Sequence, residues 1–527
     1  MILPLNHQYI DSVIQEAYSL QTIGNHIEAT QLYLSILESE PNNYNALHLL
    51  GVIELENGHP AIAAELMERA VTVVDSDPSA YNNLGEAYRR LDRLRDAERC
   101  YRRAVELADT YAIAYNNLAI TLHLLKESFE AEIMYRIALS ITPDYAEASN
   151  NLGILLASQD RFEESEEAYL RAIACNDMYV VPLINLGILY KNWGRYRESE
   201  TCYRKAHQLT PYSKDVLYNL SLLKLLQGKL KQGFALYEYR AEKYRADAAF
   251  CEWSGDRLDD CSLLVIVEQG AGDTLMMSRY LPKIKQRFNP TKIGVYCESS
   301  LQRLLLGIKG VDVCYTCDAG PPPVNLFSCY CSMMSLPYLF KTNLSTIPGV
   351  GHLFSLPEER VEFWRMKLAA LSGVKVGFVW AGNKSLEADS RRSIPLVEFK
   401  PIAEVSGCTF VSLQKGERAV DLAEVDWFIY DFMNECVDYL DTAALVVNLD
   451  LVISVDTSVA HLAGILGKKV WLLNRYESEW RWMLNHEDSP WYPTMRIFRQ
   501  ETRCSWSSTL QSVARQLLEL KNNSFLD

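Results

Sequence analysis

The chain has 527 residues, 49% of them apolar and 23% charged, a composition typical of a globular protein with three or four domains. It has no run of 18 or more uncharged apolar residues, and its start lacks the basic region of a signal peptide. We therefore expect a cytoplasmic protein without a membrane span. The 67 acidic and 52 basic residues give a net charge of -15, which disfavours binding to nucleic acid.

The 13 cysteines are an odd number and are scattered through apolar segments. Cys314, Cys317, Cys329 and Cys331 lie close enough in sequence to leave a zinc site open as an alternative. The rest of a zinc-knuckle pattern is missing, however. We expect free thiols in strands and loops and no bound metal.

A repeat of about 34 residues runs through the first half of the chain, in about seven units. Small residues at two helical positions let paired helices approach closely, and a Pro or Asp column separates the units. The pattern predicts a tetratricopeptide (TPR) superhelix over residues 1–245, a fold that binds proteins but implies no chemistry by itself. The two columns of small residues are Ala17, Gly51, Gly85, Ala119, Gly153, Gly187 and Ser221, then Ala29, Ala63, Ala97, Ala131, Ser165, Ser199 and Gly233.

Asparagine forms two further columns in the same register. One interpretation is that Asn is simply common at this position of TPR sequences. The other is a ladder of amides that holds the backbone of an extended polypeptide. The array is similar to the TPR superhelix of the O-GlcNAc transferases, and this resemblance implies that the main column binds an acceptor protein. The main column is Asn83, Asn117, Asn151, Asn185 and Asn219, and the neighbouring column is Asn82, Asn116 and Asn150.

From residue 262 the pattern changes to short apolar runs that alternate with helical stretches, which is typical of parallel sheets. We predict two Rossmann-like lobes, 246–355 and 356–527, in the GT-B arrangement of many sugar transferases. A helix within 355–373 would connect them. The predicted strands are 263–267, 292–297, 374–380, 409–413, 451–455 and 469–473, and the predicted helices are 274–288, 299–307, 441–448 and 459–466.

The first lobe begins with a strand and a glycine loop. Gly270 and Gly272 permit a tight turn and close approach of a ligand at the carboxyl end of the strand. Asp273 follows them, and it either caps the next helix or acts as a general base toward an acceptor hydroxyl. Glu268 competes for the role of base, and the sequence does not rank the two.

The second lobe offers polar residues after two of its strands. Gly382 and Asn383 follow the strand 374–380, and Arg392 and Ser393 come next. Arginine suits a diphosphate, although a solvated basic loop is the alternative. A further pair, Gln414 and Lys415, is placed to touch the nucleotide or its phosphates after the strand 409–413.

The segment Asp456, Thr457, Ser458 and His461 connects a buried strand to a helix. The free N–H groups of the helix start are a ready anion site, and the hydroxyls add donors. His461 either reaches a phosphate or sugar or has a structural role. Three tryptophans of the following region fit an aromatic cleft wall or a brace between the lobes, and we favour the structural role.

Three segments together carry a resemblance: EQGAGDTLMMSRYLP, VGFVWAGN with RRS, and DLVISVDTSVAHLAG with WRWML and SPWYPTMRIFRQ. They resemble bacterial TPR-containing glycosyltransferases whose catalytic half is similar to the heptosyltransferases. The resemblance implies that Asp273 is the base, that Asp456, Thr457, Ser458 and His461 contact donor sugar and diphosphate, and that no metal takes part. A lysine of the heptosyltransferases has no clear equivalent here, and Arg392 is the substitute candidate.

We therefore expect an inverting glycosyltransferase that moves a sugar from a nucleotide-sugar co-substrate to a Ser or Thr hydroxyl of a protein held by the TPR groove. The resemblance extends to flagellin glycosyltransferases built on this plan. Two alternatives stay open: a transferase for glycan or lipid-linked acceptors with the repeats for docking, and a non-enzymatic TPR scaffold with a degenerate transferase domain. The sequence leaves the sugar, the base, the acceptor and assembly through the repeats undetermined.

Overall fold

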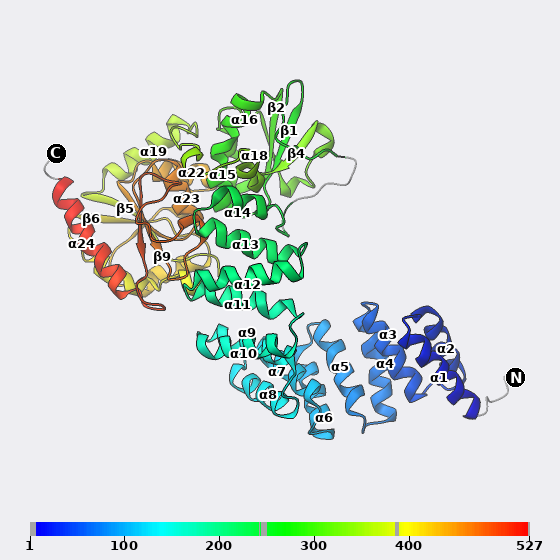
Figure 1. Ribbon diagram of the computed structural model, residues 1–527. Coiled ribbons are helices and arrows are strands. Elements are labelled where there is room, and N and C mark those ends of the chain that lie inside the picture. Colours follow the sequence, from blue (N-terminus) through cyan, green and yellow to red (C-terminus); the bar gives the residue numbers. More distant parts are fainter. Residues whose placement is uncertain (1–6, 242, 244–249, 385–388, 525–527) are drawn as a thin grey trace. The chain divides into compact units, whose positions relative to one another are not determined.

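The computed structural model describes residues 7–241, 243, 250–384 and 389–524 (Figure 1). The chain divides into two compact units, Met1–Leu209 and Thr210–Asp527. The division lies one helix pair before the boundary expected at residue 245. The last helix pair that follows the repeat pattern thus belongs to the unit that also contains the sheets.

Over its described residues, unit 1 consists of twelve helices, and consecutive helices pack side by side (Figure 1). This confirms the predicted helical repeats. The helices are α1 (His7–Thr22), α2 (His26–Ser39), α3 (Tyr44–Glu56), α4 (Pro60–Val73), α5 (Pro78–Arg90), α6 (Leu94–Leu107), α7 (Ala112–Leu124), α8 (Ser128–Ile141), α9 (Ala146–Ser158), α10 (Phe162–Cys175), α11 (Val180–Asn192) and α12 (Tyr196–Leu209).

The glycines of the repeat face a large side chain of the following helix. A Cβ atom added at Gly153 would lie 2.6 Å from the Tyr169 ring, and one added at Gly187 would lie 2.5 Å from the Tyr203 ring. These distances are shorter than any van der Waals contact between carbon atoms. A side chain is excluded at the glycines of this column because a buried tyrosine, or Met67 opposite Gly51, occupies its space.

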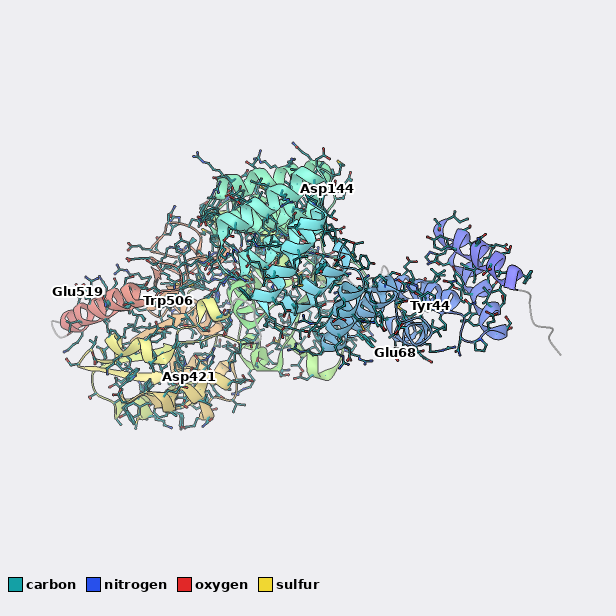
Figure 2. All side chains as sticks on the ribbon, turned by 90° about the horizontal axis from the view of Figure 1, so that it is seen from below. Tyr44, Glu68, Asp144, Asp421, Trp506 and Glu519 are labelled. Carbon is teal, nitrogen blue, oxygen red and sulfur yellow. The ribbon has the colours of Figure 1, made fainter. Side chains whose placement is uncertain are left out.

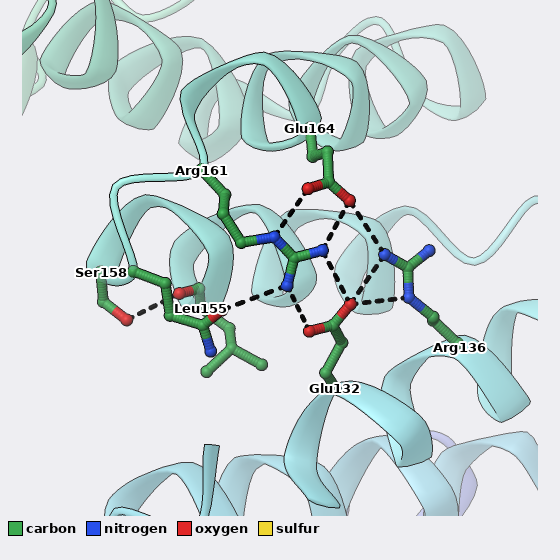
Figure 3. A network of polar contacts seen from close by, with 7 residues as sticks. Glu132, Arg136, Leu155, Ser158, Arg161 and Glu164 are labelled. Atoms are coloured by element: carbon green, nitrogen blue, oxygen red, sulfur yellow. Dashed lines mark hydrogen bonds and ion pairs between the residues drawn. The ribbon is translucent and has the colours of Figure 1, made fainter. Parts of the chain in front are cut away.

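Ion pairs join neighbouring repeats on the surface of unit 1 (Figure 3). Arg161 binds Glu132 of the preceding repeat at 2.5 Å and Glu164 of its own repeat at 2.6 Å. Arg136 contacts the same two carboxylates, at 2.8 and 3.3 Å. Two arginines and two glutamates thus form one closed network, which favours a single spacing of the repeats.

Unit 2 begins with α13 (Lys214–Leu226) and α14 (Leu230–Tyr237), followed by a four-stranded sheet. The strand order is β3-β2-β1-β4, and all pairs are parallel. Because β2 and β4 lie on opposite sides of β1, the carboxyl end of β1 is a switch point, where open sheets bind ligands. The strands are β1 (Ser262–Ile266), β2 (Lys292–Cys297), β3 (Val313–Thr316) and β4 (Cys329–Ser332).

A second sheet has six strands in the order β10-β9-β8-β5-β6-β7, again all parallel. Its switch point lies between β5 and β8. Its core includes buried aromatic residues such as Trp506, which Figure 2 labels. The strands are β5 (Val374–Val379), β6 (Cys408–Ser412), β7 (Tyr430–Asp431), β8 (Leu451–Val455), β9 (Val470–Asn474) and β10 (Met495–Arg499).

The predicted helices form, with one interruption. The helix expected at 274–288 is split into α15 (Ala271–Met277), the 3-10 turn η1 (Ser278–Tyr280) and α16 (Leu281–Phe288), because Pro282 has no N–H to continue an α-helix. The connecting helix is α19 (Glu358–Ala369), and α22 (Tyr439–Val446), α23 (Ser458–Ile465) and α24 (Ser507–Ser524) follow. In the described part of the chain, no helix combines the length and apolar character needed to cross a membrane.

The cysteine cluster does not form a zinc site. Cys314 lies on β3, whereas Cys329 and Cys331 lie on β4, and these strands are the opposite edges of the first sheet. No group of three or more metal-binding side chains is found among the described residues. Closeness in sequence does not bring these thiols together, because parallel crossovers separate the two strands.

Candidate functional site

Asp273 lies in the first turn of α15, just beyond the carboxyl end of β1. Gly270 is the N-cap residue and no side chain caps this helix, so Asp273 does not have the capping role. Its Oδ1 atom instead accepts a hydrogen bond of 2.7 Å from Nε of Arg481 and lies 2.6 Å from Nη2 of the same guanidinium, as an ion pair. Arg481 lies in the 3-10 turn η9 (Trp480–Trp482), which follows β9 of the six-stranded sheet. The pair therefore joins the two halves of unit 2, one with the four-stranded sheet and one with the six-stranded sheet.

Glu268, the competing candidate for the base, is enclosed. Its side chain is 4% exposed and forms an ion pair with Arg240, whose side chain is fully buried. Burial raises the pKa of Glu268 above its usual value, and the charge of Arg240 opposes the shift. Arg240 also donates to Ser335 at 3.0 Å. Glu268 thus connects α14 to the first sheet, while the Asp273 carboxylate faces Arg481.

The two glycines of the first loop differ in what surrounds them. A Cβ atom at Gly272 would lie 2.9 Å from the His461 ring and 3.6 Å from Cα of Ser458, whereas one at Gly270 would meet nothing within 4 Å. Gly272 therefore permits α15 to pack directly against the start of α23. The close approach is to the protein's own helix, and it brings Asp273 next to that helix start.

The start of α23 carries polar groups around an uncapped helix end. Thr457 is the N-cap residue and makes no side-chain cap bond. Its hydroxyl lies 3.0 Å from the Ser454 hydroxyl, and Ser458 accepts a hydrogen bond of 2.7 Å from the hydroxyl of Tyr439. Burial raises the pKa of Asp456 above its usual value, with Glu479 adding to the shift and Arg481 opposing it. The N–H groups of the first turn keep the capacity to bind an anion.

His461 is buried one turn into α23. Its Nδ1 atom lies 2.8 Å from the Tyr492 hydroxyl, and its ring stacks on Trp482 with centroids 4.8 Å apart. Burial, together with the charges of Arg481 and Arg279, holds the pKa of His461 well below its usual value. The imidazole is therefore neutral at physiological pH and packs between aromatic rings.

Arg392 is the last residue of α20 (Asp389–Arg392), Ser393 follows it, and both lie against the loop after β5. Arg392 donates to the backbone carbonyl of Asp456 at 3.2 Å, and a Cβ atom at Gly382 would lie 2.3 Å from its guanidinium. Ser393 accepts from the Gly382 N–H at 2.9 Å and donates to Asp389 at 2.8 Å. These residues join the loop to the start of α23, and Asn383 lies exposed beside them.

Gln414 and Lys415 have partners within the protein. The Gln414 side-chain carbonyl accepts from the N–H groups of Trp380 and Ala381, at 3.3 and 3.0 Å. Lys415 donates to the carbonyl of Cys436 at 2.7 Å. Gln414 thus fixes the loop after β5, and the Lys415 ammonium is directed to a backbone carbonyl.

An aromatic cluster packs α14 against this site. Trp480 contacts Phe234, Tyr237 and Trp491, with ring centroids 5.7 to 6.3 Å apart. The Tyr237 hydroxyl lies 2.8 Å from the side-chain amide of Gln269, next to the glycine loop. The structural role expected for this tryptophan-rich region is confirmed, because these rings form a buried brace.

The asparagine columns of unit 1 bind one another from repeat to repeat. The amide of the main column donates to the side-chain carbonyl of the neighbouring column in the preceding repeat. One N–H of each amide is thereby committed, and the second keeps the capacity to donate. The pairs are Asn117 with Asn82 at 2.9 Å, Asn151 with Asn116 at 3.1 Å and Asn185 with Asn150 at 2.9 Å.

This series of amides has two defined ends. At the first, Asn83 lies 3.0 Å from Nε2 of His48, whose pKa is lowered by burial, and Tyr44 (labelled in Figure 2) donates to Asp77. At the other, Asn219 belongs to unit 2 and donates to the carbonyl of Asp215 in its own helix, at 2.9 Å.

Three family models match the chain, at residues 76–144, 130–177 and 182–212, and all of them are models of the tetratricopeptide repeat. The repeats are therefore TPRs. The chain is 26% identical over 319 residues to Protein FlbA of Caulobacter vibrioides, and the aligned segment covers 56% of this chain. The chain spans about half the length of that relative, 53%.

Solved structures resemble the TPR part. MamA is 25% identical, with a TM-score of 0.29, and covers 31% of this chain and 94% of its own. PilF of Pseudomonas aeruginosa is 18% identical, with a TM-score of 0.36, and the match covers 40% of this chain and 95% of PilF. YrrB, a TPR protein with an unusual peptide-binding site, is 15% identical, with a TM-score of 0.30, and covers 35% and 96%.

The structure thus brings Asp273, Gly272, Asp456–His461 and Arg392 together beside helix α14, which follows the repeat register of the sequence. Arg481 was missed as their partner, because 208 residues separate it from Asp273. The signal present was an arginine between two tryptophans, a residue type that pairs with carboxylates when half-buried. The asparagine bonds between repeats were also missed, although the two parallel columns indicated them.

Proposed function

We propose that the protein is an inverting, metal-independent glycosyltransferase with a GT-B arrangement, which glycosylates Ser or Thr hydroxyls of a protein. The observation that supports this most is the meeting of a carboxylate, Asp273, with an uncapped helix start at Ser458. Both follow the carboxyl ends of parallel strands at switch points, where open sheets bind ligands. The chemistry needs both a base and an anion site.

In the proposed reaction, Asp273 takes the proton of the acceptor hydroxyl while the oxygen of that hydroxyl attacks the anomeric carbon of the donor sugar. The bond from that carbon to the diphosphate breaks, and its electron pair leaves with the nucleotide. Negative charge therefore develops on the diphosphate. The first N–H groups of α23 and the guanidinium of Arg392 would stabilise it.

TPRs generally mediate protein–protein interactions, and the repeats here would hold the acceptor. Each paired asparagine of the main column has a second N–H for a polypeptide carbonyl. The amides bind one another, so they are held in place before an acceptor arrives. Such pre-organisation lowers the cost of binding an extended chain.

A thermal-shift screen of the full chain against UDP, ADP, GDP, CMP and dTDP tests the donor site. A nucleotide at 100 times its dissociation constant should add about 2.7 kcal/mol of stability. The matching nucleotide sugars are then tested for transfer to a co-purified acceptor protein, with the Asp273→Asn variant as the control. Transfer by wild type and none by the variant would support the proposal.

The second candidate is a TPR scaffold without transferase activity. The observation that favours it is the engagement of Asp273 by Arg481, since a base must accept a proton. Failure of every nucleotide to stabilise the protein would contradict the transferase and favour the scaffold, whereas full transfer by the Asp273→Asn variant would contradict the role of Asp273 as the base.

A further inference from the structure

The contact between Asp273 and Arg481 has the geometry of a lock between the two halves of unit 2. Two guanidinium nitrogens converge on the same carboxylate oxygen, at 2.7 and 2.6 Å. The side chains are 13% and 17% exposed, so water screens the pair only weakly. Oδ1 of Asp273 is therefore engaged by the guanidinium, and this oxygen is not available for the proton of an acceptor hydroxyl while the contact lasts.

All three nitrogens of the Arg481 guanidinium face acidic groups. Nε and Nη2 bind Asp273, and Nη1 lies 3.5 Å from Glu479. Burial alone would lower the pKa of Arg481, but the charges of Asp273 and Glu479 raise it above its usual value. The guanidinium is therefore fully charged and is held by the protein's own carboxylates.

The lock adjoins the anion site at the start of α23. Gly272, next to Asp273, packs on Ser458 and His461, and Trp482, next to Arg481, stacks on the His461 ring. An anion at the first turn of α23 thus arrives beside the guanidinium. Diphosphate has more charge and more acceptor oxygens than a carboxylate, so it can compete for an arginine.

We propose that the Asp273–Arg481 ion pair is a resting-state lock that a diphosphate group opens. The incoming diphosphate takes Arg481, and Asp273 is released to act as the base. The release of the base rests on the proposed transferase function, but the competition for Arg481 does not. The lock would keep the carboxylate engaged until a donor is bound.

The test measures the dissociation constants of inorganic pyrophosphate and of the nucleotides UDP, ADP, GDP and CDP by calorimetry on full-length variants. Because Asp273 competes for Arg481, the Asp273→Asn variant should bind pyrophosphate about five- to fiftyfold more tightly than wild type. The Arg481→Gln variant should bind it at least fivefold more weakly. Arg481→Lys keeps the charge but loses the bidentate guanidinium, so its affinity for pyrophosphate should lie between those of wild type and Arg481→Gln.

The matched control is Glu479→Gln, which removes an equal charge from the other side of Arg481. It should tighten binding less than Asp273→Asn does, because its contact is longer. Equal tightening by both variants would overturn the lock in favour of a general charge effect. Unchanged or weaker binding by Asp273→Asn would also overturn it, as would wild-type binding by Arg481→Gln.

The outcomes separate the two proposals. If pyrophosphate shows the expected order of affinities but no nucleotide binds more tightly than pyrophosphate, the lock stands and the nucleotide-sugar transferase is contradicted. If one nucleotide is preferred and supports transfer while Asp273→Asn leaves its affinity unchanged, the transferase stands and the lock is overturned.

Discussion

The buried ion pair between Arg240 and Glu268 gives the most specific prediction about stability. Arg240 is fully buried and also donates to Glu238 at 3.1 Å and to Ser335 at 3.0 Å. In the variant Arg240→Met, Glu268 stays buried without its cation. Breaking a buried pair from one side costs about 3–5 kcal/mol, because an uncompensated charge remains.

A double-mutant cycle isolates the pair. Glu268→Gln keeps the volume and removes the charge, and it should cost about 1–2 kcal/mol, since Arg240 keeps Glu238 as a partner. Adding Glu268→Gln to Arg240→Met should recover at least about 1 kcal/mol, because the stranded charge disappears. Urea unfolding followed by tryptophan fluorescence measures unit 2, since among the ten tryptophans Trp193 alone precedes residue 210.

The same pair predicts a pH dependence. Burial raises the folded-state pKa of Glu268 above its usual 4.5. Its contribution to stability is therefore fully present below pH 4.5 and is lost as the pH rises through the folded-state pKa. The difference in unfolding free energy between wild type and Glu268→Gln should fall over that window. A cost below 1 kcal/mol for Arg240→Met, or a double variant no more stable than the single one, would refute the reasoning.

Three further predictions concern the repeat helices from α1 to α13, measured as the midpoint of helical unfolding by circular dichroism on the full chain. Gly187→Val should cost about 1–3 kcal/mol, because the new side chain overlaps the Tyr203 ring. Arg161→Ala should cost about 1 kcal/mol, since it removes bonds to two repeats, and added salt should reduce this loss. Asn151→Ala should cost about 1 kcal/mol, whereas Asn219→Ala should cost less, because Asn219 bonds within its own helix.

Each of these has an outcome that contradicts it. A wild-type midpoint for Gly187→Val would mean that packing against the tyrosine ring does not require a small residue at this position. A loss for Arg161→Ala that salt does not change would assign its role to the side-chain stem. Equal losses for the two asparagine variants would contradict the role of the bonds between repeats.

Much of the fold was predictable because it is periodic. The repeat predicted the helix pairs, and six apolar runs predicted strands within one residue of their observed ends. The missed strands β3, β4 and β7 are only two to four residues long, and the apolar run of β10 is interrupted by Arg496. Strand order was not predictable either, which is why the cysteines of β3 and β4 seemed to be neighbours.

The residues of the candidate site that directly follow a strand were predictable from the sequence. The residue that joins the site through a contact with a distant part of the chain, Arg481, was not. Asp273 and the segment at Thr457 follow buried strands, and parallel strands bring such ends together. Arg481 has no such position, because its turn follows a loop after β9. Its role emerges only when the two halves of unit 2 meet, and the pairing of Arg240 with Glu268 emerges only when α14 meets the first sheet.

Helix α14 belongs to the repeat pattern of the sequence and also packs against the α/β part of unit 2. Its glycine, Gly233, follows the repeat register, and a Cβ atom there would lie 2.5 Å from Leu225 of α13, as expected for a TPR pair. Two of its other residues, Phe234 and Tyr237, pack on Trp480 of the turn η9, next to Arg481. The last repeat is therefore a wall of the α/β unit, so a substitution that loosens α14 should alter the Asp273–Arg481 pair even though α14 supplies neither residue.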